Sequence, residues 1–252
     1  MQKNLNRILY SMCYDMLEQK HEAFKSNGLA IFSPETLLWV WLAQGRSSAD
    51  VRLFFNEFLH KFFLPKNEVL LGIVAEKDIA SICAEMYAFV KGAKYVQNEM
   101  IAYFLPSEVD ILGAGELRAV SAVEMPIILE WLQAFYAETL NHTLPSQKLE
   151  KSTANENTSS MKLYTLWEKE PVAMGVLTGT GETCRINLVY VNPAHRGKGY
   201  GRKIVAGLAR KARENLQLPV LYTSCDNIAA NRLYKSLGFD EAGRLSEVRF
   251  SI

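Results

Sequence analysis

Apolar residues recur at helical spacing along the first sixty residues of the chain. The spacing predicts helices over residues 4–24, 33–45 and 48–63. Asn27-Gly28 follows the first of these as a stop signal, and Ser33-Pro34-Glu35 is typical of a helix start, with an N-cap residue, a proline and an early acid. We therefore expect the chain to begin with three helices.

The pattern changes in the next stretch. It predicts a strand, a helix and a second strand over residues 69–75, 78–90 and 94–105. Segment 106–115 carries a proline and two glycines and is the best linker candidate. We expect a helix-rich N-terminal α/β domain over residues 1–112 and a second domain over 116–252.

In the second half, strands and helices alternate. Residues 116–120 predict a strand, and a capping box at Ser121–Glu124 opens a helix that reaches Leu140. After a polar segment at 145–160, further strands are expected over residues 161–167, 171–177, 185–191, 220–224 and 244–250. These elements predict an α/β fold with a mixed sheet of six or seven strands and helices on both faces.

A run of glycines and bases follows the strand that ends at Val191. After Asn192-Pro193 the chain reads Arg196-Gly-Lys-Gly-Tyr-Gly-Arg202, and an amphipathic helix comes next. A glycine at every second position lets backbone N–H groups turn inward, and the helix adds unpaired donors and the positive end of its dipole. The run predicts a diphosphate site; the alternative is a tight connection that needs glycine for its conformation alone.

The spacing of these glycines argues against two common phosphate motifs. It is Gly-x-Gly-x-Gly, whereas a dinucleotide-binding loop has Gly-x-Gly-x-x-Gly. Gly197-Lys198 is followed by glycine, where a P-loop has the Ser or Thr that binds magnesium. Dinucleotides and nucleoside triphosphates are therefore less favoured ligands.

Two sequence blocks resemble the GNAT superfamily of acyl-CoA-dependent N-acyltransferases. In the first, Val189–Gly201, the family pattern of Arg or Gln, two residues, Gly, one residue and Gly or Ala is filled by Arg196, Gly199 and Gly201. The second, Asn227–Phe239, is similar to the family's Asn, short helix, Tyr and Gly-Phe. The resemblance covers residues 116–252 and implies a GNAT-like sheet there.

The resemblance implies acetyl-CoA as co-substrate and no metal. The loop amides would hold the diphosphate, the backbone of the preceding strand would pair with the pantetheine arm, and a strand N–H would bind the developing oxyanion. The side chains of that strand can pack in the core at the same time. The candidate cofactor-binding residues are Val189, Tyr190, Val191, Arg196, Gly197, Lys198, Gly199, Tyr200, Gly201, Arg202 and Asn227.

By the same resemblance Tyr234 is the candidate catalytic acid, which would protonate the departing thiolate. The alternative is a tyrosine that only packs on its helix. Asn227 would either hydrogen-bond the pantetheine or cap the helix. For Arg196, Lys198 and Arg202, we favour steering and ion pairing with a diphosphate over a role in solubility.

No carboxylate stands out as the base that deprotonates the acceptor amine. Asn187 and Tyr222 occupy positions where some relatives have carboxylates. Glu182, or a water chain ending at Tyr190 or Tyr222, is a candidate. Histidine is a common base in proteins, but His195 lies inside the phosphate loop and fits charge complementarity better.

Charge and cysteine content restrict the class of protein. Lys and Arg total 28 against 27 acids among 252 residues, so the basic stretch Lys203–Arg213 is weak support for nucleic-acid binding. The longest apolar run, Leu37–Ala43, is too short to span a membrane. The four scattered cysteines have no metal-site spacing and are expected to be reduced. Together with the short apolar runs, this predicts a soluble, cytoplasmic protein.

These observations predict an N-acetyltransferase that moves an acetyl group from acetyl-CoA to a primary amine on a small molecule or peptide, by direct attack in a ternary complex. The alternative is a non-catalytic acyl-CoA-binding regulatory module. Residues 66–105 lack the glycine loop but could be the remnant of a degenerate second copy of the fold; otherwise they belong to an unrelated accessory domain.

Overall fold

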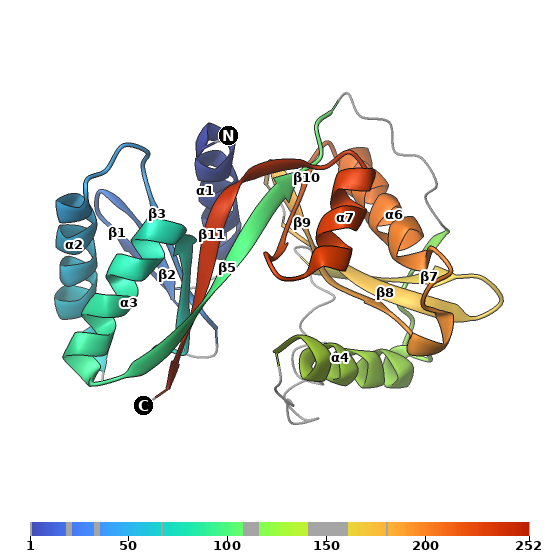
Figure 1. Cartoon of the computed structure of the whole chain (residues 1–252), viewed down its shortest axis with the longest axis horizontal. Coiled ribbons are helices and arrows are strands. Elements are labelled where there is room, and N and C mark those ends of the chain that lie inside the picture. Colours follow the sequence, from blue (N-terminus) through green and yellow to red (C-terminus); the bar gives the residue numbers. More distant parts are fainter. Residues whose placement is uncertain are drawn as a thin grey trace. The chain divides into compact units, whose positions relative to one another are not determined.

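The computed structural model describes residues 2–18, 22–32, 36–66, 68–107, 116–140, 161–179 and 181–251. The chain forms two compact units. Unit 1 comprises residues 1–103, 222–231 and 241–252, and unit 2 comprises 104–221 and 232–240. The last part of the chain therefore contributes to both units (Figure 1). The linker expected over 106–115 lies mostly outside the described residues.

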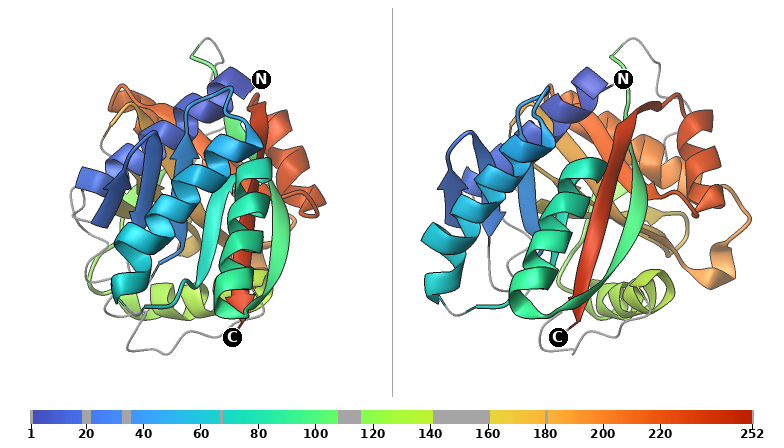
Figure 2. Two further views of the ribbon diagram at one scale, coloured as in Figure 1. Left: turned by 90° about the vertical axis from the view of Figure 1, so that its left-hand side faces the viewer. Right: turned by 60° about the vertical axis from the view of Figure 1, so that its left-hand side comes forward.

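Unit 1 is a mixed sheet with helices on both faces. Its strands lie in the order β1 (Glu22–Lys25), β2 (Gly28–Phe32), β3 (Leu38–Leu42), β4 (Gly72–Glu76), β11 (Asp240–Ser251) and β5 (Lys94–Phe104). Helices α2 (Ser48–Glu57) and α3 (Lys77–Lys91) pack side by side over one face (Figure 2). α2 continues into a π-helix, Phe58–Phe63, and a 3₁₀ turn, Leu64–Lys66.

The helix expected over residues 33–45 is wrong, because Leu38–Leu42 is strand β3. Leu38, Val40 and Leu42 face the core under α2 and α3. Trp41 points to helix α1 (Gln2–Glu18), where its indole N–H donates to the carbonyl of Asn6 (3.0 Å). A strand buried on both faces is an uninterrupted apolar run, and such a run does not distinguish strand from helix.

The first predicted helix is also too long at its end. Residues 22–24 belong to β1, which pairs antiparallel with β2 around a turn at Ser26-Asn27. Asn27-Gly28 therefore marks the hairpin turn. The other elements expected in unit 1, the helix at 48–63, the strand at 69–75, the helix at 78–90 and the strand at 94–105, are confirmed to within a few residues.

Unit 2 has the strand order β10 (Leu218–Ser224), β9 (Thr183–Val191), β8 (Pro171–Thr178), β7 (Met161–Trp167) and β6 (Leu117–Ala119). Helix α4 (Met125–Leu140) packs on Leu163, Met174 and Tyr190. Helix α6 (Tyr200–Glu214) contacts β8 and β9, and α7 (Ile228–Ser236) follows β10. Of the capping box expected before α4, one bond is present: the Ser121 backbone N–H donates to the Glu124 carboxylate (2.8 Å), whereas the Glu124 N–H donates to the Ser121 carbonyl (3.0 Å). The polar segment 145–160 lies outside the described residues.

The two halves of the chain have the same order of elements. In β1–β2–β3–α2–β4–α3–β5, three antiparallel strands precede a helix and a strand that is parallel to the third. In β7–β8–β9–α6–β10–α7–β11, the same orientations recur. The topology of the second half is therefore repeated in the first.

Candidate active site

Strand β9 is distorted shortly before the glycine-rich turn. The register with β8 shifts between Met174 and Val176, and Leu188 has a φ of 48°. This left-handed conformation is costly for leucine. The parallel pairing with β10 covers Thr183 to Arg185, so the main chain from Leu188 to Val191 lies beyond that ladder. A bulge at this place turns the end of β9 into an edge that an extended ligand can follow.

The turn after β9 is built by one asparagine and two glycines. The Asn192 side chain accepts from the Ala194 N–H (3.0 Å) and starts a 3₁₀ turn, Pro193–His195. Gly197 and Gly199 have φ of 77° and 80°, the region that favours glycine. No atom lies within 4 Å of a Cβ built on either residue. The glycines are therefore needed for backbone direction and not to avoid a neighbour.

The backbone N–H groups from Gly197 to Gly201, called here the amide nest, are available to a ligand. In the turn, the N–H groups of His195, Arg196, Arg202 and Lys203 bond to carbonyls. Throughout the described part of the chain, those of the amide nest have no acceptor. They stand at the N-terminus of the 15-residue helix α6, whose dipole favours an anion.

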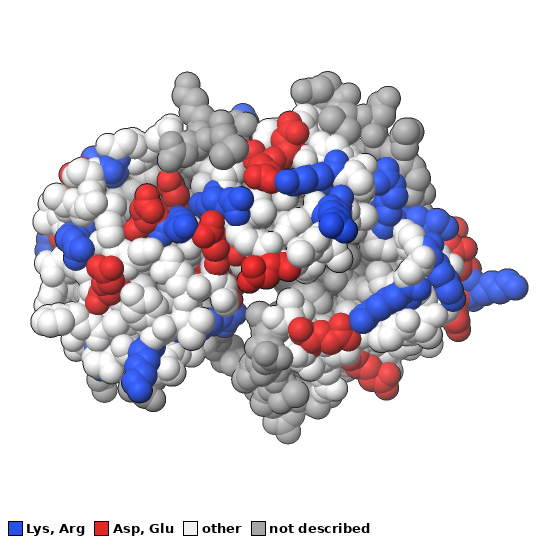
Figure 3. Space-filling view, in the orientation of Figure 1, with Lys and Arg blue, Asp and Glu red and all other residues white. Residues whose placement is uncertain are grey.

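The three predicted ion-pairing bases have different partners. Arg196 contacts both carboxylate oxygens of Glu138 in α4, at 3.0 and 2.8 Å. Lys198 donates to the Ala194 carbonyl (3.2 Å), and Arg202 donates to the carbonyl and hydroxyl of Ser236 (3.0 and 2.8 Å). Many Lys and Arg side chains lie where unit 2 carries α6 and α7 (Figure 3). The glycine-rich turn therefore lies in a basic region, yet one of its bases is neutralised.

Helix α7 lies beside the first turn of α6. A Cβ on Gly201 would stand 3.8 Å from Val191 and 3.6 Å from Leu233, so Gly201 lies between the end of β9 and α7. Tyr234 follows Leu233, is 8% exposed, and packs near the ring of Phe239. The structure thus brings Val191, the amide nest and the segment that carries Tyr234 together in unit 2.

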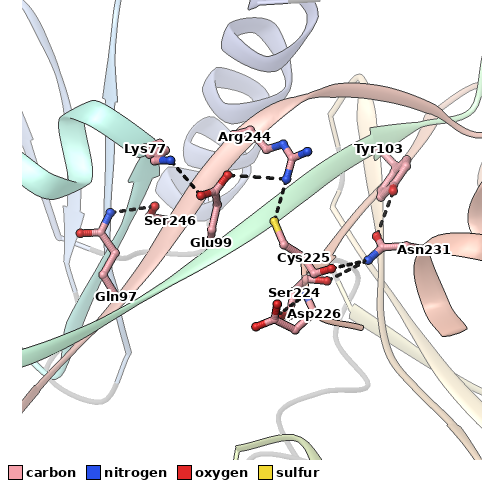
Figure 4. Close-up of polar contacts among 10 residues, drawn as sticks. All are labelled: Lys77, Gln97, Glu99, Tyr103, Ser224, Cys225, Asp226, Asn231, Arg244 and Ser246. Atoms are coloured by element: carbon pink, nitrogen blue, oxygen red, sulfur yellow. Dashed lines mark hydrogen bonds and ion pairs between the residues drawn. The ribbon is translucent and has the colours of Figure 1, made fainter. Parts of the chain in front are cut away.

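Asn227 caps α7, one of the two roles expected for it. Its side chain accepts from the Ala230 N–H (3.1 Å). The same block contains Asn231, which the sequence analysis did not single out. Asn231 donates to the carbonyls of Ser224 and Cys225 (3.0 and 3.2 Å) and accepts from the Tyr103 hydroxyl (2.9 Å) (Figure 4). It holds the first turn of α7 against the chain that enters it.

The candidate bases lie in different surroundings. Glu182 precedes β9, about 20 Å of extended chain from Val189. The Tyr222 ring packs on Trp39 in unit 1, with ring centres 6.1 Å apart. His195 pairs with Glu170 (3.2 Å). Asn187 donates to the Thr178 hydroxyl (2.8 Å). None of these contacts directs a carboxylate at the amide nest.

Tyr190 is buried and points to α4. Its hydroxyl lies 3.4 Å from Glu138, and burial, followed by the charge of Glu138, raises the pKa of the phenol. A phenol with a raised pKa stays protonated near neutral pH, so Tyr190 is a poor base. Glu138 was missed in the sequence analysis because it lies in an ordinary helical pattern, with no motif to single it out.

Residues 125–239 match the sequence model of the Acetyltransferase (GNAT) family. This match covers the glycine-rich turn, the bulged strand and Tyr234, so the part of the chain that carries the candidate site is similar to GNAT-family acetyltransferases. The recognition made from the two sequence blocks and the expected α/β fold class are thereby confirmed.

Two curated relatives are similar over short segments. One is the L-methionine sulfoximine/L-methionine sulfone acetyltransferase of Salmonella typhimurium, 41% identical over 61 residues, which are 24% of this chain and 36% of that protein. The other is the mycothiol acetyltransferase of Kocuria rhizophila, 41% identical over 66 residues, 25% of this chain and 22% of that protein. The matches therefore span well under half the length of either relative.

Solved structures resemble the chain over nearly its whole length. A GCN5-related N-acetyltransferase from Kribbella flavida has a TM-score of 0.65 at 14% identity, covering 97% of this chain and 94% of its own. A GNAT-family acetyltransferase from Colwellia psychrerythraea has a TM-score of 0.59 at 15% identity, covering 100% and 97%. At these identities the likeness shows the fold alone.

No described helix is long and apolar enough to cross a membrane. No group of three or more His, Cys, Asp or Glu residues in the described part of the chain could hold a metal ion.

Proposed function

We propose that the protein is an N-acetyltransferase that transfers the acetyl group of acetyl-CoA to a primary amine on a small molecule or peptide. The observation that carries this proposal is the amide nest, five consecutive N–H groups at the start of α6 that have no acceptor among the described residues, inside the segment that matches the GNAT family. A diphosphate is the anion that such a set of donors suits.

The proposed donor site comprises the nest and the end of β9. The N–H groups of Gly197, Lys198, Gly199, Tyr200 and Gly201 would bind the diphosphate, with Lys198 and Arg202 supplying charge. The main chain of Val189, Tyr190 and Val191 would pair with the amides of the pantetheine arm, which the bulge at Leu188 supports. In this scheme Asn227 acts by capping α7.

The proposed reaction is direct attack. The amine nitrogen forms a bond to the thioester carbon, a strand N–H stabilises the oxyanion, and the C–S bond then breaks. Tyr234 gives its proton to the departing thiolate of CoA, the attacking nitrogen loses one proton to water, and water returns a proton to the Tyr234 phenolate, so that the amide and CoA thiol are the products. The amine must enter neutral, and we propose that it loses its proton to water, since Tyr190 has a raised pKa and Glu182 lies far along β9.

Acetyl transfer is tested by release of free CoA thiol from acetyl-CoA with a panel of primary amines. The panel begins with methionine sulfone, because one relative is named for it. We expect turnover that Tyr234→Phe lowers by about 10²-fold, the size of one lost acid catalyst, while CoA affinity changes little. Tight CoA binding with no turnover on any amine would instead favour the regulatory module.

Two further proposals concern the whole chain. The repeated element order supports a first half that is a degenerate copy of the GNAT fold. Cys13, Cys83, Cys184 and Cys225 form no disulfide among the described residues, which supports a reducing cytoplasmic location. Fractionation of cells that make the tagged protein tests the location.

A further inference from the structure

Arg196 contacts three residues at the start of the amide nest. Besides both oxygens of Glu138, its guanidinium donates through Nε to the Val191 carbonyl (3.1 Å). The same group lies over the Tyr190 ring, 5.2 Å from its centre. These contacts tie three places together: α4, the last residue of β9, and the residue directly before Gly197.

Because of these partners, the three bases differ in how much of their positive charge is left to attract an anion. Arg196 is neutralised by Glu138 through two hydrogen bonds of good length. Lys198 and Arg202 contact only carbonyl and hydroxyl oxygens among the described residues, so their charges remain for an anion. An anion at the nest would gain less from Arg196 than from the other two.

The contacts of Arg196 indicate that it holds the turn in shape. Its bond to Val191 closes the turn across five residues, and Glu138 fixes the guanidinium from outside the turn. The N–H groups that follow can bind an anion only if the turn keeps its direction, because left-handed glycines such as Gly197 otherwise have wide conformational freedom. Preorganised donors bind better than donors that a ligand must first order.

We propose that Glu138 and Arg196 form a positioning pair, which favours acetyl-CoA binding by holding the amide nest in shape and not through the charge of Arg196. This inference rests on the proposed function. It assigns a role to Glu138, on α4, in recognition of the donor by a turn 58 residues further along the chain.

The decisive variant is Glu138→Gln, because a role through charge and a role through position predict opposite changes in CoA affinity. If Arg196 acts by charge, removing the carboxylate frees the guanidinium and removes a negative charge from the neighbourhood, so CoA binds more tightly. If the pair acts by position, the turn loosens and CoA binds more weakly, by about three- to fivefold for a half-exposed ion pair. Calorimetric titration with CoA measures the difference.

The ion pair between Lys203 in α6 and Glu168 provides a matched control. Lys203 and Glu168 form an ion pair of the same length, 2.8 Å, and of similar exposure. Among the described residues neither side chain of this pair hydrogen-bonds to the main chain of the turn, and Lys203 only lies over the Tyr200 ring, 5.2 Å from its centre. Glu168→Gln removes the same charge, and we expect CoA affinity within twofold of wild type. Weakening by Glu168→Gln equal to that by Glu138→Gln would overturn the inference, since charge loss near α6 would then suffice.

Two further measurements separate position from folding. The double variant Glu138→Gln/Arg196→Ala should bind CoA as Arg196→Ala does, because the pair acts as one unit. Hydrogen exchange without ligand should be faster in Glu138→Gln than in wild type at the bonded N–H groups of the turn, those of His195, Arg196, Arg202 and Lys203, at an unchanged melting temperature. Additive losses, or unchanged exchange, would contradict the positioning role. Wild-type protein that fails to bind CoA would contradict the proposed function, whereas the exchange experiment still tests the pair.

Discussion

Single residues decide whether the glycine-rich turn can bind an anion. Gly197 and Gly199 take backbone conformations that cost an L-residue about 1 kcal/mol or more. A Cβ built on either residue would meet no described residue within 4 Å other than its neighbours in the chain. Any effect of a side chain there would come from backbone strain. Replacing them therefore tests the direction of the N–H groups without disturbing packing.

We expect Gly199→Ala to lower stability by about 1 kcal/mol and CoA affinity by about tenfold or more, because the turn must relax and redirect its N–H groups. Gly45→Ala is the matched control. Gly45 has a φ of 85°, likewise has no atom within 4 Å of a built Cβ, and lies in the corresponding turn of the first half. It should cost similar stability and leave CoA binding unchanged. Thermal unfolding and calorimetric titration measure the two effects, and equal affinity losses would disprove the assignment.

The sequence singled out the residues of the proposed donor site but not their partners. Arg196, Gly199 and Gly201 were selected by their spacing, which one segment of chain contains. Glu138 contacts Arg196, which lies 58 residues further along the chain, and the spacing of residue types in the sequence does not indicate such a contact. Whether a base is free or neutralised therefore depended on the fold.

At the scale of elements, the two strand-to-helix turns differ in what occupies the helix start. In the first half, Ser47 caps α2 and forms a capping box with Asp50, whose carboxylate accepts from the Ser47 N–H (2.9 Å) and hydroxyl (2.8 Å). These bonds lower the pKa of Asp50 and keep a negative charge at the helix start. The position that an anion would take is thus filled by the chain itself.

We therefore expect one CoA per chain. Titration should give a stoichiometry near one, and Ser47→Ala should lower stability by about 1 kcal/mol without changing that number. The stability loss follows because the variant removes the side-chain acceptor of the Asp50 N–H. Two equivalent sites in wild type would show that the turn of the first half also binds the ligand.

Elements were predicted well where one periodicity was clear. Amphipathic α6 and the half-buried strands of unit 2 carry distinct patterns, and their limits agree with expectation. β3 was misread as a helix because both of its faces are buried, one under α2 and α3 and the other at α1. Burial on two faces removes the alternation that would have revealed the strand.

At the scale of the whole molecule, the chain does not divide at one point. β11 ends the sequence but pairs antiparallel with β4 from Gly72 to Glu76, within unit 1. Leu245 and Val248 are 1% and 0% exposed in that position. The second half therefore depends on the first for the partner of its last strand.

A fragment of residues 116–252 should consequently be much less stable than the full chain. It would expose the apolar side chains of β11 and leave a strand edge unpaired, which favours aggregation. Soluble yield and cooperative thermal unfolding are the measurements. Co-expression with residues 1–112 should restore solubility, and a fragment that unfolds cooperatively at the temperature of the full chain would refute the dependence.

The sequence by itself determined the resemblance to the GNAT family, the fold class and the position of the glycine-rich turn, because each depends on residue types at short, fixed spacing. The tertiary structure decided which N–H groups remain without an acceptor, which base is neutralised by Glu138, and that β11 pairs with β4 in unit 1. These depend on contacts between residues far apart in the chain, which only the packing of helices and strands brings together.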